Sequence, residues 1–368
     1  MRVAIMCDVP DQFTGLEVYT NDLVKYACSL EHESVFPVHR KHSKTISEHD
    51  ILLPTFPKIM GASLVRNTIL LPIILKKHGI DIVHYPTQSH FSSLCPLGIK
   101  QVLTIHDTLP LIMPNNFPKY LVYQFKTLWP ILIQKIDKII AVSESTKRDV
   151  MKYYGIGEEK IIVVHEGVGD EFKPLSESEM ADMKYAFGFP FILYVGTLEP
   201  RKNIPTIIRA FLKLKEAGYA HKLVICGKKG WMFDEIFNLV SELALKTDVI
   251  FTGYIPKNDL VKLYNAADLF VYPSLYEGFG LPPLEAMACG TPVITSNHSS
   301  LPEVVGNSGI MVEPNDIQGL SNAMIKFLTD KDFRQDMIRL GLERVKLFSP
   351  KQSVINTLQV YRDVLKRN

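Results

Sequence analysis

The chain lacks the features that mark several large classes of protein. Its 368 residues include five cysteines, an odd number without a CxxC spacing, which excludes a small disulfide scaffold and is typical of reduced thiols in the cytoplasm. The first residues are interrupted by charge too early to form a signal peptide. The longest apolar stretch, residues 69–75, is far shorter than the roughly 20 residues that cross a bilayer, so we expect no membrane span.

Charge and metal-binding patterns are also scarce. Lys plus Arg is 41 and Asp plus Glu is 39, so the net charge is only +2 and nucleic acid is not an expected partner. The GxGxxG fingerprint is absent, which argues against a dehydrogenase. The four histidines between His32 and His49 lack a metal spacing, and Asp330-Lys-Asp332 suits a helix cap between two helical patterns. We therefore expect no metal and no cofactor.

Two series of short apolar runs alternate with segments of helical length. Continuous apolarity is typical of strands that are covered on both faces, as in a parallel sheet. The first series comprises residues 3–6, 82–84, 102–105, 139–142 and 161–164. The second comprises residues 191–195, 223–226, 249–252, 269–272 and 293–295. The pattern predicts an α/β protein with two doubly wound domains in tandem.

Turn glycines in residues 165–170, followed by a polar stretch through Pro190, indicate the linker between these domains. We therefore divide the chain into domains at 1–170 and 171–348, with a helix at 349–368. Ser349 and Pro350 are typical of a helix start. The last helix presents one apolar face, formed by Val354, Leu358, Tyr361 and Leu365. This face predicts that the helix packs back on the first domain.

The richest segment is residues 272–290, where a strand, a loop with two glycines and a short helix follow one another. Glu277 lies in the loop, and Glu285 is expected in the first turn of a helix that begins at Pro282. A helix N-terminus attracts anions, and carboxylates accept bonds from hydroxyl groups. The segment predicts a site for an anion with a polyhydroxylated group beside it. The alternative is a glutamate that only complements the helix dipole, with glycines that only turn the chain.

This string, Glu-Gly-Phe-Gly-Leu-Pro-Pro-Leu-Glu from Glu277 to Glu285, resembles the E-x7-E signature of the large fourth family of retaining glycosyltransferases. Residues 196–203, 259–268 and 300–303 also resemble that family. The likeness is dense over residues 191–314 and patchier before them. It implies the GT-B fold, in which two Rossmann-like domains face each other across a cleft. The first domain would bind the acceptor and the second a nucleotide-sugar donor.

Adjacent cations follow the first strand of the second domain. Arg201 and Lys202 suit a diphosphate, because arginine binds it as a fork and lysine as a point charge. The resemblance implies that they neutralise the leaving diphosphate. Thr197 stands where many relatives carry an arginine, and Arg201 would take over that role. A solvated turn is the alternative.

The resemblance also implies roles for other residues of the second domain. Glu277 would hold the donor sugar and Glu285 the ribose hydroxyls. Tyr254 and Ile255 would hold the base through backbone groups, with core packing of Tyr254 as the alternative. The full set of expected donor-binding residues is Gly15, Gly196, Thr197, Gly227, Lys228, Tyr254, Ile255, Gly278, Phe279, Gly280, Leu281 and Glu285.

The first domain contributes fewer candidates. Gly15 matches a glycine-rich loop of the family, although Leu16 replaces the frequent second glycine. His106 ends a strand and is implied as a contact of the donor sugar, with a satisfied structural histidine as the alternative. The expected catalytic set is therefore Glu277, His106, Arg201 and Lys202.

The resemblance implies a retaining glycosyltransferase, and Arg201, Lys202 and the helix N-terminus at Pro282 make a metal ion unnecessary for stabilising the leaving group. The resemblance is greatest to mannosyltransferases that use GDP-mannose and build cell-surface polysaccharides, and UDP-sugars are the alternative donors. The acceptor would be a saccharide or a lipid-linked saccharide. Residues 58–77 and 120–129 suggest a peripheral contact of this cytoplasmic protein with the inner face of the membrane. Alternatives are a sugar-nucleotide epimerase or phosphorylase on the same fold, or a non-catalytic sugar-binding protein.

Overall fold

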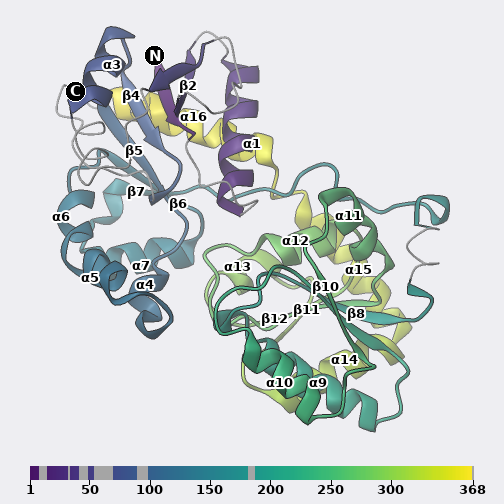
Figure 1. Cartoon of the computed structure of the whole chain (residues 1–368). Helices are drawn as coiled ribbons and strands as arrows, with labels where there is room; N and C mark the ends of the chain where they lie inside the picture. The colour runs from purple at the N-terminus through teal and green to yellow at the C-terminus, as the bar shows by residue number, and fades with distance from the viewer. Residues whose placement is uncertain are drawn as a thin grey trace. The chain divides into compact units, whose positions relative to one another are not determined.

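The computed structural model describes residues 1–7, 15–31, 34–40, 49–53, 69–88, 98–180 and 187–366. The chain divides into two compact units (Figure 1). Unit 1 comprises Met1–Gly167 together with Pro350–Asn368, and unit 2 comprises Val168–Ser349. Each unit is built around a parallel sheet with helices on both faces.

The sheet of unit 1 has seven strands in the order β3-β2-β1-β4-β5-β6-β7, and every pair is parallel. In chain order they are β1 (Val3–Met6), β2 (Val35–Arg40), β3 (Ile51–Leu53), β4 (Ile82–Tyr85), β5 (Lys100–Ile105), β6 (Lys138–Ala141) and β7 (Ile161–Val163). Val3 pairs with Val35 on one side and Ile82 on the other, so the strand order reverses between β1 and β4.

Two hydrophobic clusters cover the two faces of this sheet. One face packs against α1 (Gly15–Leu30) and α16 (Pro350–Lys366), which lie side by side in Figure 1. The other packs against helices that include α3 (Leu71–Lys77), α4 (Leu109–Ile112), α5 (Lys119–Thr127), α6 (Trp129–Ile133) and α7 (Glu144–Tyr154). Short 3-10 turns, η3 (Pro114–Asn116) and η4 (Glu158–Lys160), complete the unit. In α16, Val354, Leu358 and Tyr361 are buried together, as their spacing predicted.

The sheet of unit 2 has six parallel strands in the order β10-β9-β8-β11-β12-β13. They are β8 (Phe191–Val195), β9 (Lys222–Cys226), β10 (Val249–Gly253), β11 (Leu269–Tyr272), β12 (Val293–Ser296) and β13 (Ile310–Val312). The strand order reverses between the neighbours β8 and β11. Open α/β sheets bind ligands beyond the carboxyl ends of the strands at such a reversal.

Helices cover both faces of the second sheet as well. One face carries α9 (Ile204–Glu216), α10 (Asp234–Glu242) and α14 (Ile317–Thr329). The other carries α11 (Lys257–Ala266), α12 (Leu281–Ala288), α13 (Leu301–Val305) and α15 (Lys331–Val345). Asp330 caps α15 by accepting a hydrogen bond from the Phe333 amide, which confirms the helix-cap interpretation.

The start of α12 and the length of the described helices can be compared with the sequence predictions. Helix α12 begins at Leu281, with Gly280 at its N-cap, so Glu285 is its fifth residue and does not lie in the first turn as expected. The prediction was wrong because the helix starts one residue before the proline pair. Among the described helices, none is both long and apolar enough to cross a membrane.

Candidate active site

The reversal of strand order in unit 2 brings together two segments that carry charged side chains. The segment after β8 contains the 3-10 turn η5 (Pro200–Lys202), and the segment after β11 is the loop that carries Glu277. Main-chain bonds join the two, because the Leu275 amide donates to the carbonyl of Arg201 at 2.8 Å. Residues that are some 70 positions apart in sequence therefore form one cluster.

Glu277 is the centre of this cluster. Its Oε2 accepts a hydrogen bond from Arg201 Nη1 at 2.7 Å, and its Oε1 accepts one from Lys202 Nζ at 2.7 Å. The Ser274 hydroxyl donates to the same Oε1 at 2.6 Å. Burial alone would raise the pKa of Glu277, but the two cations outweigh it and lower the pKa to about 2. Glu277 is thus an ionised carboxylate that holds both cations in place.

The Arg201 guanidinium is held on two edges. Nη1 also donates to the Tyr276 carbonyl at 3.2 Å, and Nε pairs with the buried Glu199. Within the described ranges, Nη2 has no partner, so its two protons are available to a ligand. Burial opposes the charged form, but Glu277 and Glu199 raise the pKa of Arg201 and keep it cationic. This free edge suits a phosphate oxygen.

Lys202 is buried beside a tyrosine. Its Nζ donates to the Tyr272 hydroxyl and lies 4.9 Å from the centroid of the same ring. Burial and the neighbouring Arg201 lower the pKa of Lys202, whereas burial raises the pKa of Glu199. The cluster therefore places two basic side chains, Arg201 and Lys202, against the carboxyl groups of Glu277 and Glu199.

The loop that carries Glu277 is fixed by hydroxyl groups. The Glu277 amide donates to Ser299 Oγ at 2.9 Å, and Ser300 Oγ donates to the carbonyls of Glu277 and Phe279. The Phe279 ring is buried against Phe348, with ring centroids 5.8 Å apart. These contacts hold Glu277 in position against the two cations.

Glycine at position 227 is required by the close approach of two loops. A Cβ there would lie 1.9 Å from the carbonyl oxygen of Gly196. Residue 280 has a φ of +121°, which is unfavourable for residues other than glycine, and a Cβ there would lie 2.9 Å from the Leu301 side chain. These positions have structural reasons to be glycine, whatever ligand lies nearby.

Glu285 belongs to a separate set of contacts. The Tyr264 hydroxyl donates to its Oε2 at 2.8 Å, and no hydrogen bond or ion pair joins it to Glu277 in the described part of the chain. Burial raises the pKa of Glu285 to about 7. Its carboxyl group therefore changes charge near neutral pH, with Oε1 left to accept a bond from a ligand.

Candidates for the nucleotide base follow β9 and β10. Tyr254 is 49% exposed, so the alternative of core packing is wrong. Lys228 Nζ lies 4.9 Å from the centroid of the Tyr254 ring. Ile255 is half-buried beside it, and Thr197 is exposed after β8.

His106 follows β5 in unit 1. Its Nδ1 lies 2.8 Å from Glu166 Oε1 and its Nε2 lies 2.9 Å from the Pro86 carbonyl oxygen. A carbonyl and a carboxylate can only accept, so both nitrogens carry a proton when Glu166 is ionised. Burial would lower the pKa of His106, but Glu166 outweighs it and the pKa is raised. The ring is fixed in position, because both of its nitrogens are engaged by the chain itself.

Comparisons with known proteins identify the family of this chain. Residues 180–344 match the family described as "Glycosyl transferases group 1", and residues 13–172 match "Glycosyltransferase Family 4". O-antigen chain mannosyltransferase B of Escherichia coli is 35% identical over 268 residues, which are 72% of this chain and 70% of that relative. The chain belongs to glycosyltransferase family 4.

A longer relative and two solved structures extend the comparison. Serotype-specific mannosyltransferase WbdA of Escherichia coli is 35% identical over 260 residues. These residues are 68% of this chain but only 32% of that longer protein. A glycosyltransferase from Rickettsia africae superposes with a TM-score of 0.81 at 22% identity, covering 100% of this chain and 99% of that one. Anabaena HepE, solved with UDP and glucose, has a TM-score of 0.80 at 17% identity, covering 99% and 100%. The fold is GT-B, as the resemblance predicted.

As a family 4 glycosyltransferase, the protein is a retaining enzyme that moves a sugar from a nucleotide-sugar donor. The structure brings Glu277, Arg201 and Lys202 into one cluster, while Glu285 lies in another and His106 in unit 1. Gly278 lies in the loop after Glu277 and Leu281 begins α12. Gly15 begins α1, and residues 11–14 before it lie outside the described residues.

Sequence reasoning assigned no role to several residues that contact the predicted site residues. Glu199 lies in the segment 196–203 that resembles the family, two positions before Arg201, and that proximity was an available signal. Nothing in the sequence connects Tyr264 with Glu285 or Glu166 with His106, because each pair is joined only by the fold.

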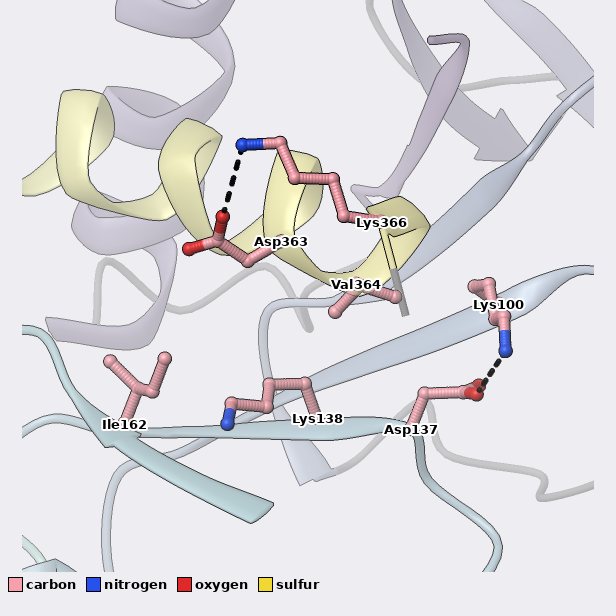
Figure 2. A pocket seen from close by; sticks show the side chains of 7 residues that line it. All are labelled: Lys100, Asp137, Lys138, Ile162, Asp363, Val364 and Lys366. Atoms are coloured by element: carbon pink, nitrogen blue, oxygen red, sulfur yellow. Dashed lines mark hydrogen bonds and ion pairs between the residues drawn. The ribbon is translucent and has the colours of Figure 1, made fainter. Parts of the chain in front are cut away.

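A cavity of about 420 Å³ lies elsewhere in unit 1 (Figure 2). It is lined by Lys100, Asp137, Lys138, Ile162, Asp363, Val364 and Lys366, none of them a predicted site residue. Its lysines already have partners: Asp137, Asp363 and the Glu159 carbonyl. We assign it no ligand.

Among the described ranges, no group of three or more His, Cys, Asp or Glu side chains could hold a metal ion.

Proposed function

We propose that this glycosyltransferase transfers mannose from GDP-mannose to a saccharide or lipid-linked acceptor during synthesis of a cell-surface polysaccharide. The names of the relatives that are 35% identical, both O-antigen or serotype-specific mannosyltransferases, support mannose as the sugar. A UDP-sugar is the alternative donor, because Anabaena HepE of the same fold was solved with UDP and glucose. The reaction in this proposal needs no metal ion.

The cluster around Glu277 carries the proposed mechanism. The free Nη2 edge of Arg201 and the ammonium of Lys202 would stabilise the negative charge that develops on the departing diphosphate. Glu277 would orient the cations and bind donor-sugar hydroxyls. As the bond from the anomeric carbon to the diphosphate oxygen breaks, the acceptor oxygen forms a bond on the same face. The acceptor proton passes to the leaving diphosphate oxygen.

The remaining candidates bind the rest of the donor. Glu285 would accept a bond from a ribose hydroxyl through Oε1, since Tyr264 occupies Oε2. Lys228, Tyr254 and Ile255 would surround the base, and the loops at Gly196 and Gly227 would bring main-chain groups to the phosphates. His106 would contribute a fixed positive charge near the donor sugar, because both of its nitrogens are engaged.

Donor choice can be tested without knowing the acceptor. Thermal unfolding is measured with GDP, UDP and ADP and with their sugars, since a ligand that binds only the folded protein raises its apparent stability. GDP-mannose should give the largest shift, and a larger shift with a UDP-sugar would contradict the proposed donor. The donor is then incubated alone, because an epimerase changes the sugar without an acceptor. Binding without turnover with any saccharide or lipid-linked acceptor would favour a sugar-binding protein.

We further propose that the protein works in the cytoplasm at the inner face of an anionic membrane, through the surface of α5 and α6. Tyr120 and Tyr123 on α5 are 69% and 68% exposed, and Leu128 and Ile131 are exposed beside them. Residues 119–135 contain three lysines and no acidic residue. Exposed aromatic side chains among lysines favour an anionic lipid surface. Of the other segment suggested by the sequence, residues 58–68 lie outside the described residues.

Vesicle co-sedimentation tests this contact. The protein should bind vesicles of phosphatidylcholine with about one third phosphatidylglycerol more strongly than pure phosphatidylcholine vesicles. The double variant Tyr120→Ser/Tyr123→Ser should lose this binding, whereas Leu347→Ser, which removes an exposed apolar residue of unit 2, should retain it. Absence of wild-type binding to both vesicles would remove the proposal.

A further inference from the structure

Glu199 is a buried acidic residue beside the cations of the Glu277 cluster. It is 4% exposed, and its Oε1 forms an ion pair with Nε of Arg201. Among the described residues, this oxygen accepts no hydrogen bond from any other group. An acidic side chain adds no attraction for a phosphate, so direct binding of an anion does not explain its place here. Its contact with Arg201 is the feature that needs a function.

The main chain at Glu199 is fixed on both sides. Main-chain hydrogen bonds of 2.9 and 3.0 Å join Leu198 to the loop after β9. That loop lies close to Glu199, because a Cβ at Gly230 would be 3.2 Å from the Cβ of Glu199. On the other side, the Lys202 amide donates to the Glu199 carbonyl at 3.1 Å. The carboxyl group therefore approaches Arg201 from a main chain that is held in place.

The contacts of the Arg201 guanidinium lie on two of its three nitrogens. Nη1 donates to Glu277 Oε2 at 2.7 Å and to the Tyr276 carbonyl at 3.2 Å, while Nε pairs with Glu199. The guanidinium is planar, so three contacts on two nitrogens also fix the direction of the third nitrogen, Nη2. This is the nitrogen that keeps its protons for a ligand.

Glu199 is the contact that prevents rotation of this group. Without it, both remaining contacts of the guanidinium, with Glu277 and the Tyr276 carbonyl, are on Nη1. The plane could then pivot about Nη1 and carry Nη2 away from its present direction. The side chain of arginine has several rotatable bonds, so such a pivot needs no movement of the main chain.

We propose that Glu199 is a positioning residue, which holds Nε of Arg201 and thereby directs Nη2 toward a phosphate of the nucleotide. The inference rests on the proposed function in one respect, because that function makes a nucleoside diphosphate the ligand of Arg201. It gives an acidic residue a part in binding an anion that it does not touch.

Nucleotide binding by Glu199→Met tests the proposal. Methionine is of similar length but has no oxygen to pair with Nε. The dissociation constants of GDP and GMP are measured by isothermal titration, because only GDP has the second phosphate. Glu199→Met should raise the dissociation constant of GDP about fivefold to tenfold and that of GMP by less than about twofold. Loss of a negative charge alone would act in the opposite direction and tighten the binding of GDP.

Matched variants separate positioning from charge and from stability. Glu199→Gln loses the charge but keeps the length and an oxygen that can accept from Nε, so it should bind GDP within about twofold of the wild type. Asp248→Asn removes the charge of another ion pair of unit 2, with Lys215 at 2.9 Å, and precedes β10 at the opposite end of the strand from the site. It should leave both dissociation constants unchanged. If Glu199→Met fails to fold, Glu199→Ser takes its place with the same expected result.

A second readout needs no nucleotide. In the full chain with 15N-labelled arginine, the Nε–H resonance of Arg201 is assigned by its loss in Arg201→Lys. In Glu199→Met this resonance should move and its proton should exchange faster with solvent, because its partner is gone. Asp248→Asn should leave it unchanged.

An unchanged Arg201 resonance in Glu199→Met would overturn the proposal. Tighter binding of GDP by this variant would also overturn it, since Glu199 would then act through its charge. The same holds for equal losses with GDP and GMP, which would indicate general damage to the nucleotide site. A wild type that binds neither nucleotide would count against the proposed donor alone, and the resonance would then decide whether Glu199 holds Arg201.

Discussion

The pKa of Glu285 predicts that donor binding depends on pH in the neutral range. Burial raises this pKa from 4.5 to about 7, while the Tyr264 hydroxyl and Lys257 act in the opposite direction and Glu171 adds to the rise. Only the ionised carboxyl group accepts a bond through both of its oxygens, one from Tyr264 and one from a ribose hydroxyl. We therefore expect the donor to bind more tightly as the pH rises through 7.

The magnitude follows from the ionised fraction. With a pKa of about 7, roughly one tenth of the Glu285 side chains are ionised at pH 6 and roughly nine tenths at pH 8. If only the ionised form binds the ribose, the dissociation constant of the donor falls about tenfold between these values. In the protein without donor, the free energy of unfolding changes in the opposite direction and falls as the pH rises. Because folding raises the pKa of Glu285, this side chain contributes its full stabilisation to the folded state below pH 4.5. That contribution is lost as the pH rises through about 7.

The assay is isothermal titration with intact GDP-mannose, whose diphosphate diester does not titrate in this range, from pH 6 to pH 8. Glu285→Gln should remove the pH dependence. Tyr264→Phe removes a bond that lowers the pKa, so it should move the midpoint above 7. An unchanged pH profile in Glu285→Gln would refute the reasoning, since another group would then cause the dependence.

Three further outcomes can be measured. Lys202→Ala should lower kcat by more than about tenfold, the effect of losing one stabiliser of the leaving group. Since that side chain is buried, unfolding is followed by circular dichroism, and wild-type activity per folded protein would contradict the role. Gly227→Ala should destabilise the protein by about 1–3 kcal/mol in urea, because its Cβ would overlap a carbonyl oxygen. Gly15→Ala is the control, since its Cβ meets nothing within 4 Å, and an equal loss there would contradict this account. Glu166→Gln should lower the pKa of His106 in an NMR titration, and an unchanged pKa would mean that Glu166 does not hold the charge.

The fold was largely predictable because most strands are buried on both faces. Continuous apolar runs identified β1, β4 to β7 and β8 to β12 within one or two residues. The missed strands are β2, β3 and β13. Strand β2 contains Pro37 and ends in His39 and Arg40, so no apolar run marks it, and the other two strands are only three residues long.

From the sequence, only those site residues that directly follow predicted strands could be identified. Arg201, Lys202 and Glu277 all lie just after strands, and parallel topology brings such residues together. Their partners could not be found this way. Tyr264 reaches Glu285 from the preceding helix, and the contact depends on how α11 and α12 pack.

The discontinuity of unit 1 has a consequence for synthesis on the ribosome. Unit 2 is a single continuous stretch of chain. In contrast, one apolar cluster of unit 1 includes Val354, Leu358 and Tyr361 of α16, and these residues are translated after all of unit 2. Translation proceeds at about 5–20 residues per second, so the first segment waits on the order of ten seconds or more for the helix that covers it. We expect the second unit in the sequence to finish folding first, and the first one to depend on help from chaperones until the chain is released.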